Sequence, residues 1–398
     1  MPATYLTRAR IVLPDRLLEN AALLIEHGRI AAIEPAGAPA SAHVVDLAGQ
    51  TLMPGLIDLH CDAIEKEAEP RARVQFPLDF AVAQVDRRNA AAGITTPYHA
   101  LSFANNEWGV RNNETAAQVV RMVRAFRGQG LVDNRVHCRY EITDPHALDV
   151  LFALIDDGAV DLLSVMDHSP GQGQFKTLEA YLQYMMGNHG MERLQAEEAA
   201  AAKLRAGDGA PARVEKLLAH AHAAGVPTAS HDDDTVHRVA TMRNLGVRMS
   251  EFPITLDTAK AAVSCGLTTI LGAPNVLRGG SQSGSMRAID AVRAGVASCL
   301  CSDYQPSTLV ASVYAVVAQS DLSLPQAAAL VTANPADACG MNDRGRIAPG
   351  LRADLVAVTQ VGTLPLVSRT WSAGRQVFSA QYPAAAEAPQ RQPQAQAA

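Results

Sequence analysis

The sequence has little that would suit a membrane or a nucleic-acid partner. It contains no apolar run of the roughly 20 residues that a membrane-spanning helix needs. It contains no cluster of Lys and Arg, and its net charge of -6 argues against nucleic-acid binding. The amino terminus lacks the apolar core of a secretory signal peptide. These absences predict a cytoplasmic protein that binds no membrane and no nucleic acid.

Cysteine is also scarce. The chain has six cysteines, and only Cys299 and Cys301 form a C-x-C pair. This pair lies in an apolar, strand-like segment, where free cysteine usually packs as a small hydrophobic residue. We therefore favour a buried strand over a thiolate metal site at this pair.

Apolar residues make up 48% of the 398 residues, and they alternate between strand-like and helix-like segments. Alanine-rich helical stretches follow most of the strand candidates. Such alternation predicts a parallel sheet, and about eight repeats are typical of a TIM-type (β/α)8 barrel. A doubly wound open sheet is the alternative, but no G-x-G-x-x-G follows a strand. The strand candidates are residues 51–60, 94–102, 135–142, 161–167, 226–230, 247–252, 267–272 and 296–302.

The two chain ends have a different texture, with short alternating strands and turn residues. We predict that residues 1–50 and 341–382 together form a small β-sandwich domain, and that residues 51–340 form the barrel. An insertion at about 171–210, which includes one charged helical stretch, is expected to be a long loop over the barrel mouth. Residues 383–398 are rich in Ala, Gln and Pro and are predicted to be disordered.

The first barrel strand ends in His60-Cys-Asp62. In an extended chain, His60 and Asp62 point to the same face, so both can reach one cation. Taken alone, this motif is more often a satisfied histidine beside a solvated aspartate. The metal reading gains weight because ligand-type side chains also end the later strands.

Active sites of such barrels lie at the carboxyl ends of the strands. Several carboxylates there would be costly to desolvate without a cation. Imidazole and carboxylate suit zinc, the default, or manganese or iron, as one or two ions. Glu141 would bridge two ions, Asp303 would be the catalytic base, and water bound to such an ion has a pKa of about 7. The predicted metal ligands are His60, Asp62, Glu141, His168, His231 and Asp303.

Other polar residues near these ends have open roles. Among Asp232, Asp233 and Asp234, one is expected to orient His231 and another to cap the next helix. Glu251 ends the sixth strand, and its role stays open.

A glycine-rich segment follows the seventh strand and predicts an anion site, although a flexible loop is the alternative. Arg71, after the first strand, is either a second phosphate clamp or part of a solvated turn. The predicted substrate-binding residues are Arg71, Asn275, Arg278, Gly279, Gly280 and Ser281.

Several segments are specific in combination, and they span nearly the whole chain. They are Asp58-Leu-His-Cys-Asp62, Glu69-Pro-Arg71, Ala92-Gly-Ile-Thr-Thr96, Ser164-Val-Met-Asp-His168, Ser230-His-Asp-Asp-Asp-Thr235, Ser250-Glu-Phe-Pro-Ile-Thr255, Gly272-Ala-Pro-Asn-Val-Leu-Arg-Gly-Gly-Ser281 and Ser302-Asp-Tyr304.

With these segments the sequence resembles the amidohydrolase superfamily and, within it, the diphosphatase family of phosphonate metabolism, in the carbon–phosphorus lyase pathway. The resemblance implies metal-dependent hydrolysis of α-D-ribose 1-methylphosphonate 5-triphosphate to the 5-phosphate and pyrophosphate. The partner would then be a small phosphorylated molecule. The sequence departs from the family at Cys61, usually threonine, and at His99, where an aspartate is expected.

Two other functions stay open. A cyclic-amide or N-acyl amidohydrolase of the same superfamily is less favoured, because a two-histidine first motif and a bridging lysine are not apparent. A non-enzymatic scaffold would be expected to have lost the ligand residues that this chain retains. A homo-oligomer is compatible with the sequence.

Overall fold

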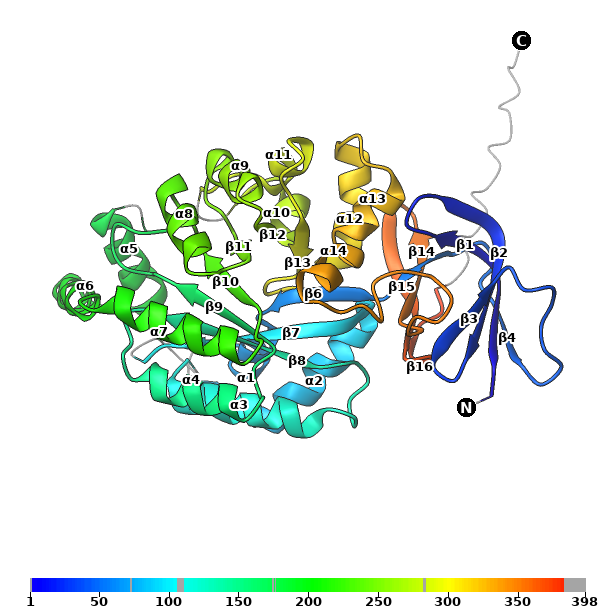
Figure 1. The fold of residues 1–398 in the computed structure, drawn as a ribbon, viewed down its shortest axis with the longest axis horizontal. Coiled ribbons are helices and arrows are strands. Elements are labelled where there is room, and N and C mark those ends of the chain that lie inside the picture. The colour runs from blue at the N-terminus through cyan, green and yellow to red at the C-terminus, as the bar shows by residue number, and fades with distance from the viewer. Residues whose placement is uncertain are drawn as a thin grey trace, which may run out of the picture.

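The computed structural model describes residues 2–71, 74–105, 111–173, 175, 177–281 and 284–382. Within these ranges the strands form two sheets of eight strands each. One sheet is surrounded by helices, and the other lies beside it near the amino terminus (Figure 1). The tail 383–398 lies outside the described residues, so its predicted disorder stays a prediction.

The helix-covered sheet is a parallel barrel. Each neighbouring pair of strands is parallel. The first and last strands meet through a bridge between Cys61 and Asp303, where the Asp303 N–H donates to the His60 carbonyl at 2.9 Å. The TIM-type (β/α)8 prediction is thus confirmed. The strands are β6 (Leu56–Cys61), β7 (Ile94–Phe103), β8 (Arg135–Glu141), β9 (Leu162–Met166), β10 (Thr228–His231), β11 (Met249–Glu251), β12 (Thr268–Gly272) and β13 (Cys299–Cys301).

Helices cover the outside of this barrel because each has one apolar stripe, with polar residues on the other side. Several helices begin at a polar cap: the Thr255 side chain, for example, accepts from the Thr258 N–H ahead of α9. The covering helices are α1 (Ala63–Ala68), α2 (Leu78–Ala91), α3 (Asn113–Phe126), α4 (Ala147–Asp156), α7 (Ala210–Ala223), α8 (Val236–Asn244), α9 (Leu256–Ser264), α10 (Ala273–Arg278), α11 (Ala288–Arg293), α12 (Thr308–Gln319), α13 (Leu324–Ala329) and α14 (Ala333–Ala338). None of the described helices is long and apolar enough to cross a membrane.

The insertion after β9 is a helical hairpin, so the prediction of a long loop is wrong. It contains α5 (Leu178–His189) and α6 (Arg193–Ala206), joined by a turn in which Gly190 has a φ of 62°. The hairpin has its own small apolar cluster. The alternation of strands and helices in the barrel does not predict such an additional unit. That cluster consists of Phe175, Tyr181, Leu182, Met185, Ala196 and Ala200.

Both chain ends contribute to the second sheet, as predicted. Its order is β16-β15-β14-β5-β1-β2-β3, with β4 paired to β1. Nearly all these strands contribute residues to one apolar cluster, which includes Leu23, Leu52 and Trp371. The strands are β1 (Thr4–Val12), β2 (Leu17–Glu26), β3 (Arg29–Ile33), β4 (His43–Asp46), β5 (Thr51–Pro54), β14 (Leu355–Val361), β15 (Leu364–Ser372) and β16 (Arg375–Ser379).

The predicted single strand 51–60 is divided between the two sheets. Thr51–Pro54 pairs with β1 and β14 in the second sheet, and Leu56–Cys61 begins the barrel. Gly55 stands at the crossing, where a Cβ atom would lie 2.3 Å from the Thr95 hydroxyl oxygen. The domain limits, 1–50 with 341–382 and 51–340, stay a prediction.

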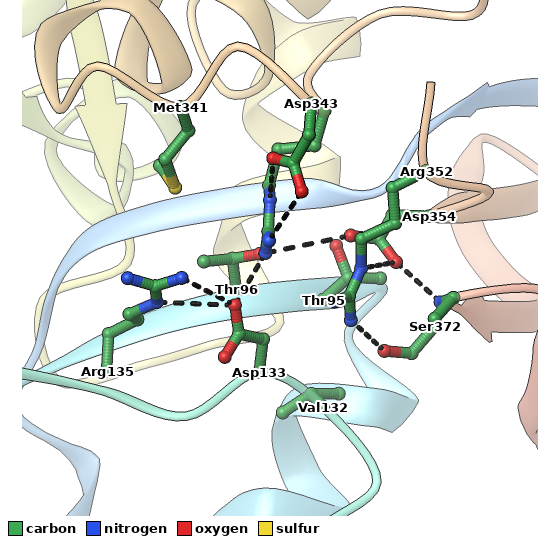
Figure 2. Close-up of polar contacts among 12 residues, drawn as sticks. Thr95, Thr96, Val132, Asp133, Arg135, Met341, Asp343, Arg352, Asp354 and Ser372 are labelled. Atoms are coloured by element: carbon green, nitrogen blue, oxygen red, sulfur yellow. Dashed lines mark hydrogen bonds and ion pairs between the residues drawn. The ribbon is translucent and has the colours of Figure 1, made fainter. Parts of the chain in front are cut away.

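A buried ionic network joins the two parts on the side of the barrel away from the carboxyl ends (Figure 2). Arg344 donates to Asp133, just before β8, at 2.6 Å and to Thr96 in β7 at 3.0 Å. Asp354, just before β14, accepts from Arg352 at 2.9 Å. Since Arg344 is only 5% exposed, its charge depends on these partners rather than on water.

Candidate metal centre at the carboxyl ends of the barrel strands

The structure brings five of the six predicted ligand residues into close groups at the barrel mouth. Within each group the ligand atoms lie within 4.8 Å of one another. Asp232 and Glu251 join them, although the sequence left their roles open. The groups are His60, Asp62 and Asp303; His168, His231 and Asp232; and His60, His231 and Glu251.

Glu251 positions two histidines at once. One carboxylate oxygen lies 2.9 Å from His60 Nδ1, and the other lies 3.1 Å from His231 Nδ1. A carboxylate only accepts, so both Nδ1 atoms carry the hydrogen, and the two Nε2 atoms face the remaining donors. The sequence expected an aspartate of 232–234 to orient His231. That expectation is wrong, because Glu251 does so from the adjacent strand.

The donors carry excess negative charge. Burial would lower the pKa of His60, but Glu251 and Asp62 on either side raise that pKa to about 10. The His60 and Asp62 side chains are close, since His60 Nε2 lies 3.3 Å from an Asp62 oxygen. Without a metal, a proton on His60 thus neutralises part of the charge of Glu251 and Asp62, which a bound cation would otherwise do.

A strained backbone recurs at three of the strand ends. Asp232, Phe252 and Asp303 follow β10, β11 and β13 with φ values of 55°, 51° and 55°. Each donates its N–H to a backbone carbonyl of the neighbouring strand, at 2.8–2.9 Å. The left-handed region costs a non-glycine residue about 1–3 kcal/mol, and such residues concentrate at functional sites.

Phe252 uses this turn to pack against the histidines. Its ring centre lies 5.0 Å from that of His60 and 5.2 Å from that of His231, edge to face in both cases. The ring therefore limits the rotation of both imidazoles and excludes water from one side of them.

Glu141 ends β8 beside His168 and outside the three groups. One of its oxygens lies 3.2 Å from His168 Nδ1 and 3.4 Å from the Lys203 ammonium, and the other accepts from Thr143 at 2.8 Å. Burial would raise the pKa of Glu141, but Lys203 and His168 hold it at about 2. Glu141 is therefore an ionised carboxylate, and its predicted bridging role stays a prediction.

Three cationic side chains that sequence reasoning missed gather around these donors. Arg139, 5% exposed, places NH1 3.3 Å from one Asp62 oxygen. Arg111 approaches the other oxygen of Asp62 at 3.7 Å. Lys203 arrives from α6 in the inserted hairpin. Arg139 lies two residues before Glu141 on one strand, so strand periodicity could have revealed it, whereas no local pattern marks Lys203.

Asp303 combines burial with a like-charged neighbour. Burial and the Asp62 carboxylate raise the pKa of Asp303 to about 6. A carboxylate with this pKa is mostly ionised at neutral pH and can still accept a proton. Its predicted role as a base is therefore chemically feasible, and it stays a prediction.

The segment after β12 is more ordered than a glycine-rich loop. It forms α10, and Gly279 ends that helix with a φ of 74°. The Asn275 amide donates to the Met286 carbonyl at 3.0 Å and accepts from the Ala288 N–H at 2.9 Å, which fixes the return of the chain. Arg278 is exposed, and Gly280 and Ser281 are half-buried. Substrate binding by these residues stays a prediction, as it does for the exposed Arg71.

Asp233 and His99 have structural partners. Asp233 accepts from the hydroxyls of Ser230 and Ser250 at 2.5 and 2.6 Å, and so ties β10 to β11. The cap of α8 is Thr235, so the expectation that an aspartate caps this helix is wrong. His99 Nε2 pairs with the Asn134 side chain at 2.8 Å.

Comparisons with known proteins agree with this architecture. Residues 156–377 match the amidohydrolase family model. The chain is 33% identical to the α-D-ribose 1-methylphosphonate 5-triphosphate diphosphatase of Escherichia coli strain K12, over 94% of this chain and 100% of that protein.

Solved structures show the same fold. N-isopropylammelide isopropylaminohydrolase from Burkholderia multivorans has a TM-score of 0.63 at 18% identity, with 94% of this chain and 98% of that one covered. N-acetylglucosamine-6-phosphate deacetylase from Pasteurella multocida has a TM-score of 0.62 at 15% identity, with 94% and 99% covered.

Proposed function

The chain belongs to the amidohydrolase family, and from that premise we propose that it hydrolyses α-D-ribose 1-methylphosphonate 5-triphosphate to the 5-phosphate and pyrophosphate. The full-length similarity to the diphosphatase of Escherichia coli supports this substrate. The observation that carries the proposal is the set of cations around the donor groups: Arg111, Arg139 and Lys203. A triphosphate needs such cations, because several anionic oxygens must be desolvated together.

The donor set fits a divalent ion. It offers His Nε2 atoms that Glu251 orients, with ionised carboxylates beside them. Mixed nitrogen and oxygen ligands suit zinc, and also manganese or iron. His168, His231 and Asp232 would hold one ion, and His60, Asp62 and Asp303 form a second group. A bound ion supplies Lewis acidity, which polarises a phosphoryl oxygen and lowers the pKa of water.

The side chains perform the remaining tasks. Asp303 accepts the proton of the water that adds to phosphorus, while the anhydride bond to the pyrophosphate group breaks. Lys203, in α6, and Arg111, just before α3, hold the anionic oxygens that gain charge in this step. Arg guanidinium groups also orient a phosphate by paired hydrogen bonds, which a single ammonium cannot do.

The proposal includes a small phosphorylated substrate and a cytoplasmic enzyme, and a homo-oligomer remains compatible with it. A neutral cyclic amide would make no use of the three cations, which is why we favour the phosphoanhydride. The two substrate classes are separated by incubating the protein with the ribose triphosphonate and, in parallel, with a hydantoin. Product formation from the triphosphonate alone is expected, and cleavage of the hydantoin alone would contradict the proposal.

A further inference from the structure

Arg139 occupies a position between two of the candidate ligand groups. Its NH1 atom lies 3.3 and 3.5 Å from the two oxygens of Asp62, in the group with His60 and Asp303. Its NH2 atom lies 3.5 Å from Nε2 of His231, in the group with His168 and Asp232. One guanidinium therefore contacts both groups.

We propose that Arg139 is a built-in cation that takes the place of a second metal ion, so that the centre holds one divalent ion per chain. The ion is held by His168, His231 and Asp232, and Arg139 neutralises Asp62. The inference rests on the metal-dependent part of the proposed function and not on the identity of the substrate.

Charge and burial support this assignment. A guanidinium does not lose its proton in proteins, so its charge persists in the site. Arg139 is 5% exposed, and a buried charge needs a close counter-charge. Asp62 is that counter-charge.

The attachment of Arg139 makes it a fixed feature rather than a mobile one. It projects from β8 two residues before Glu141, and β8 pairs with β7 and β9 on either side. Its Nε atom has no hydrogen-bond partner among the described residues, although the atom is buried.

The test counts metal ions without any turnover. The full-length protein is loaded with excess Zn²⁺ or Mn²⁺, freed of weakly bound metal, and analysed by elemental mass spectrometry. We expect one ion per chain for the unaltered protein and for Arg139→Lys, which keeps the charge. For Arg139→Met we expect two ions, because Asp62 then loses the nearer and more deeply buried of its two guanidinium partners.

A matched control lies on the same strand. Arg135→Met removes a guanidinium that contacts Asp133 and Asp161 at the other end of β8, and it should leave the count at one. Two tightly bound ions in the unaltered protein would overturn the proposal. So would an unchanged count in Arg139→Met, or a change in the control equal to that in Arg139→Met.

Electron paramagnetic resonance of the manganese-loaded, unaltered protein keeps the test independent of whether Arg139→Met folds. An isolated Mn²⁺ signal is expected, and the signal of a coupled pair would overturn the proposal. Because no substrate enters either measurement, a failure of the diphosphatase proposal would leave the metal count to be judged separately.

Discussion

Replacing Glu251 by Gln should weaken metal binding with little change in the fold. Glu251 accepts from Nδ1 of both His60 and His231, so both rings direct Nε2 toward the other donors of the site. The Gln amide has one accepting oxygen and one donating nitrogen. The histidine facing that nitrogen must place its hydrogen on Nε2, which is the wrong tautomer for a metal ligand.

The size of the effect follows from this loss of one oriented imidazole. Removing a partner that orients a metal-ligating histidine typically costs about 10- to 100-fold in metal affinity. This corresponds to about 1.4–2.8 kcal/mol of binding free energy. The other histidine keeps its hydrogen bond, so we expect a loss of affinity rather than an empty centre.

Competition with a chelator of known affinity measures the dissociation constant. Asp86→Asn is a matched control, because Asp86 is 2% exposed and accepts from the Leu131 N–H at 2.8 Å, beneath the barrel. It should lower stability and leave metal affinity unchanged. An unchanged dissociation constant in Glu251→Gln, or an equal loss in both variants, would refute the assigned role of Glu251.

Other predictions concern the base, the inserted hairpin, the network of Figure 2 and a buried histidine. Asp303→Asn should abolish turnover while circular dichroism and most of the bound metal are retained; normal turnover would exclude it as the base. Lys203→Met should raise KM for the triphosphate more than it lowers kcat, whereas Lys203→Arg should restore binding; an unchanged KM would count against Lys203. Arg344→Met should lower the free energy of unfolding by about 3 kcal/mol, because Asp133 loses a buried partner; a chemical denaturation midpoint equal to that of the unaltered protein would disprove this. Burial lowers the pKa of His99 to about 4. The contribution of His99 to folding stability is therefore complete above its unfolded pKa of about 6.5 and is lost as pH falls toward 4. Between pH 7 and 4.5, the free energy of unfolding of His99→Gln should therefore fall by about 2–3 kcal/mol less than that of the unaltered protein. Equal pH dependence of the free energy of unfolding in the two proteins would contradict this assignment.

The barrel and most of its ligand residues were predictable because both depend on local periodicity. Apolar strands alternating with alanine-rich helices specify a (β/α)8 barrel, and residues at i and i+2 on a strand share one face. His60 and Asp62 could be paired for this reason. Parallel strands then place His168, His231 and Asp303 at the same end as that pair.

What the sequence could not predict depends on distant contacts. The role of Glu251 requires β6 and β10 to lie on either side of its carboxylate, which only the closed barrel provides. Lys203 reaches Glu141 from a hairpin with its own apolar cluster, and no strand-end pattern indicates it. The division of the predicted strand 51–60 into β5 and β6 at Gly55 was also not predicted, because both strands are apolar and differ only in the sheet that they join.

The central claim is that the mouth of this barrel hydrolyses a triphosphate ester with a bound divalent ion. It is tested most directly by phosphorus NMR on chelator-stripped protein before and after one equivalent of Zn²⁺ or Mn²⁺ is restored. We predict that α-D-ribose 1-methylphosphonate 5-triphosphate gives equal amounts of pyrophosphate and the 5-phosphate only after the ion is restored. Turnover by the stripped protein, stepwise release of orthophosphate, or no turnover by protein shown to hold metal would contradict the claim.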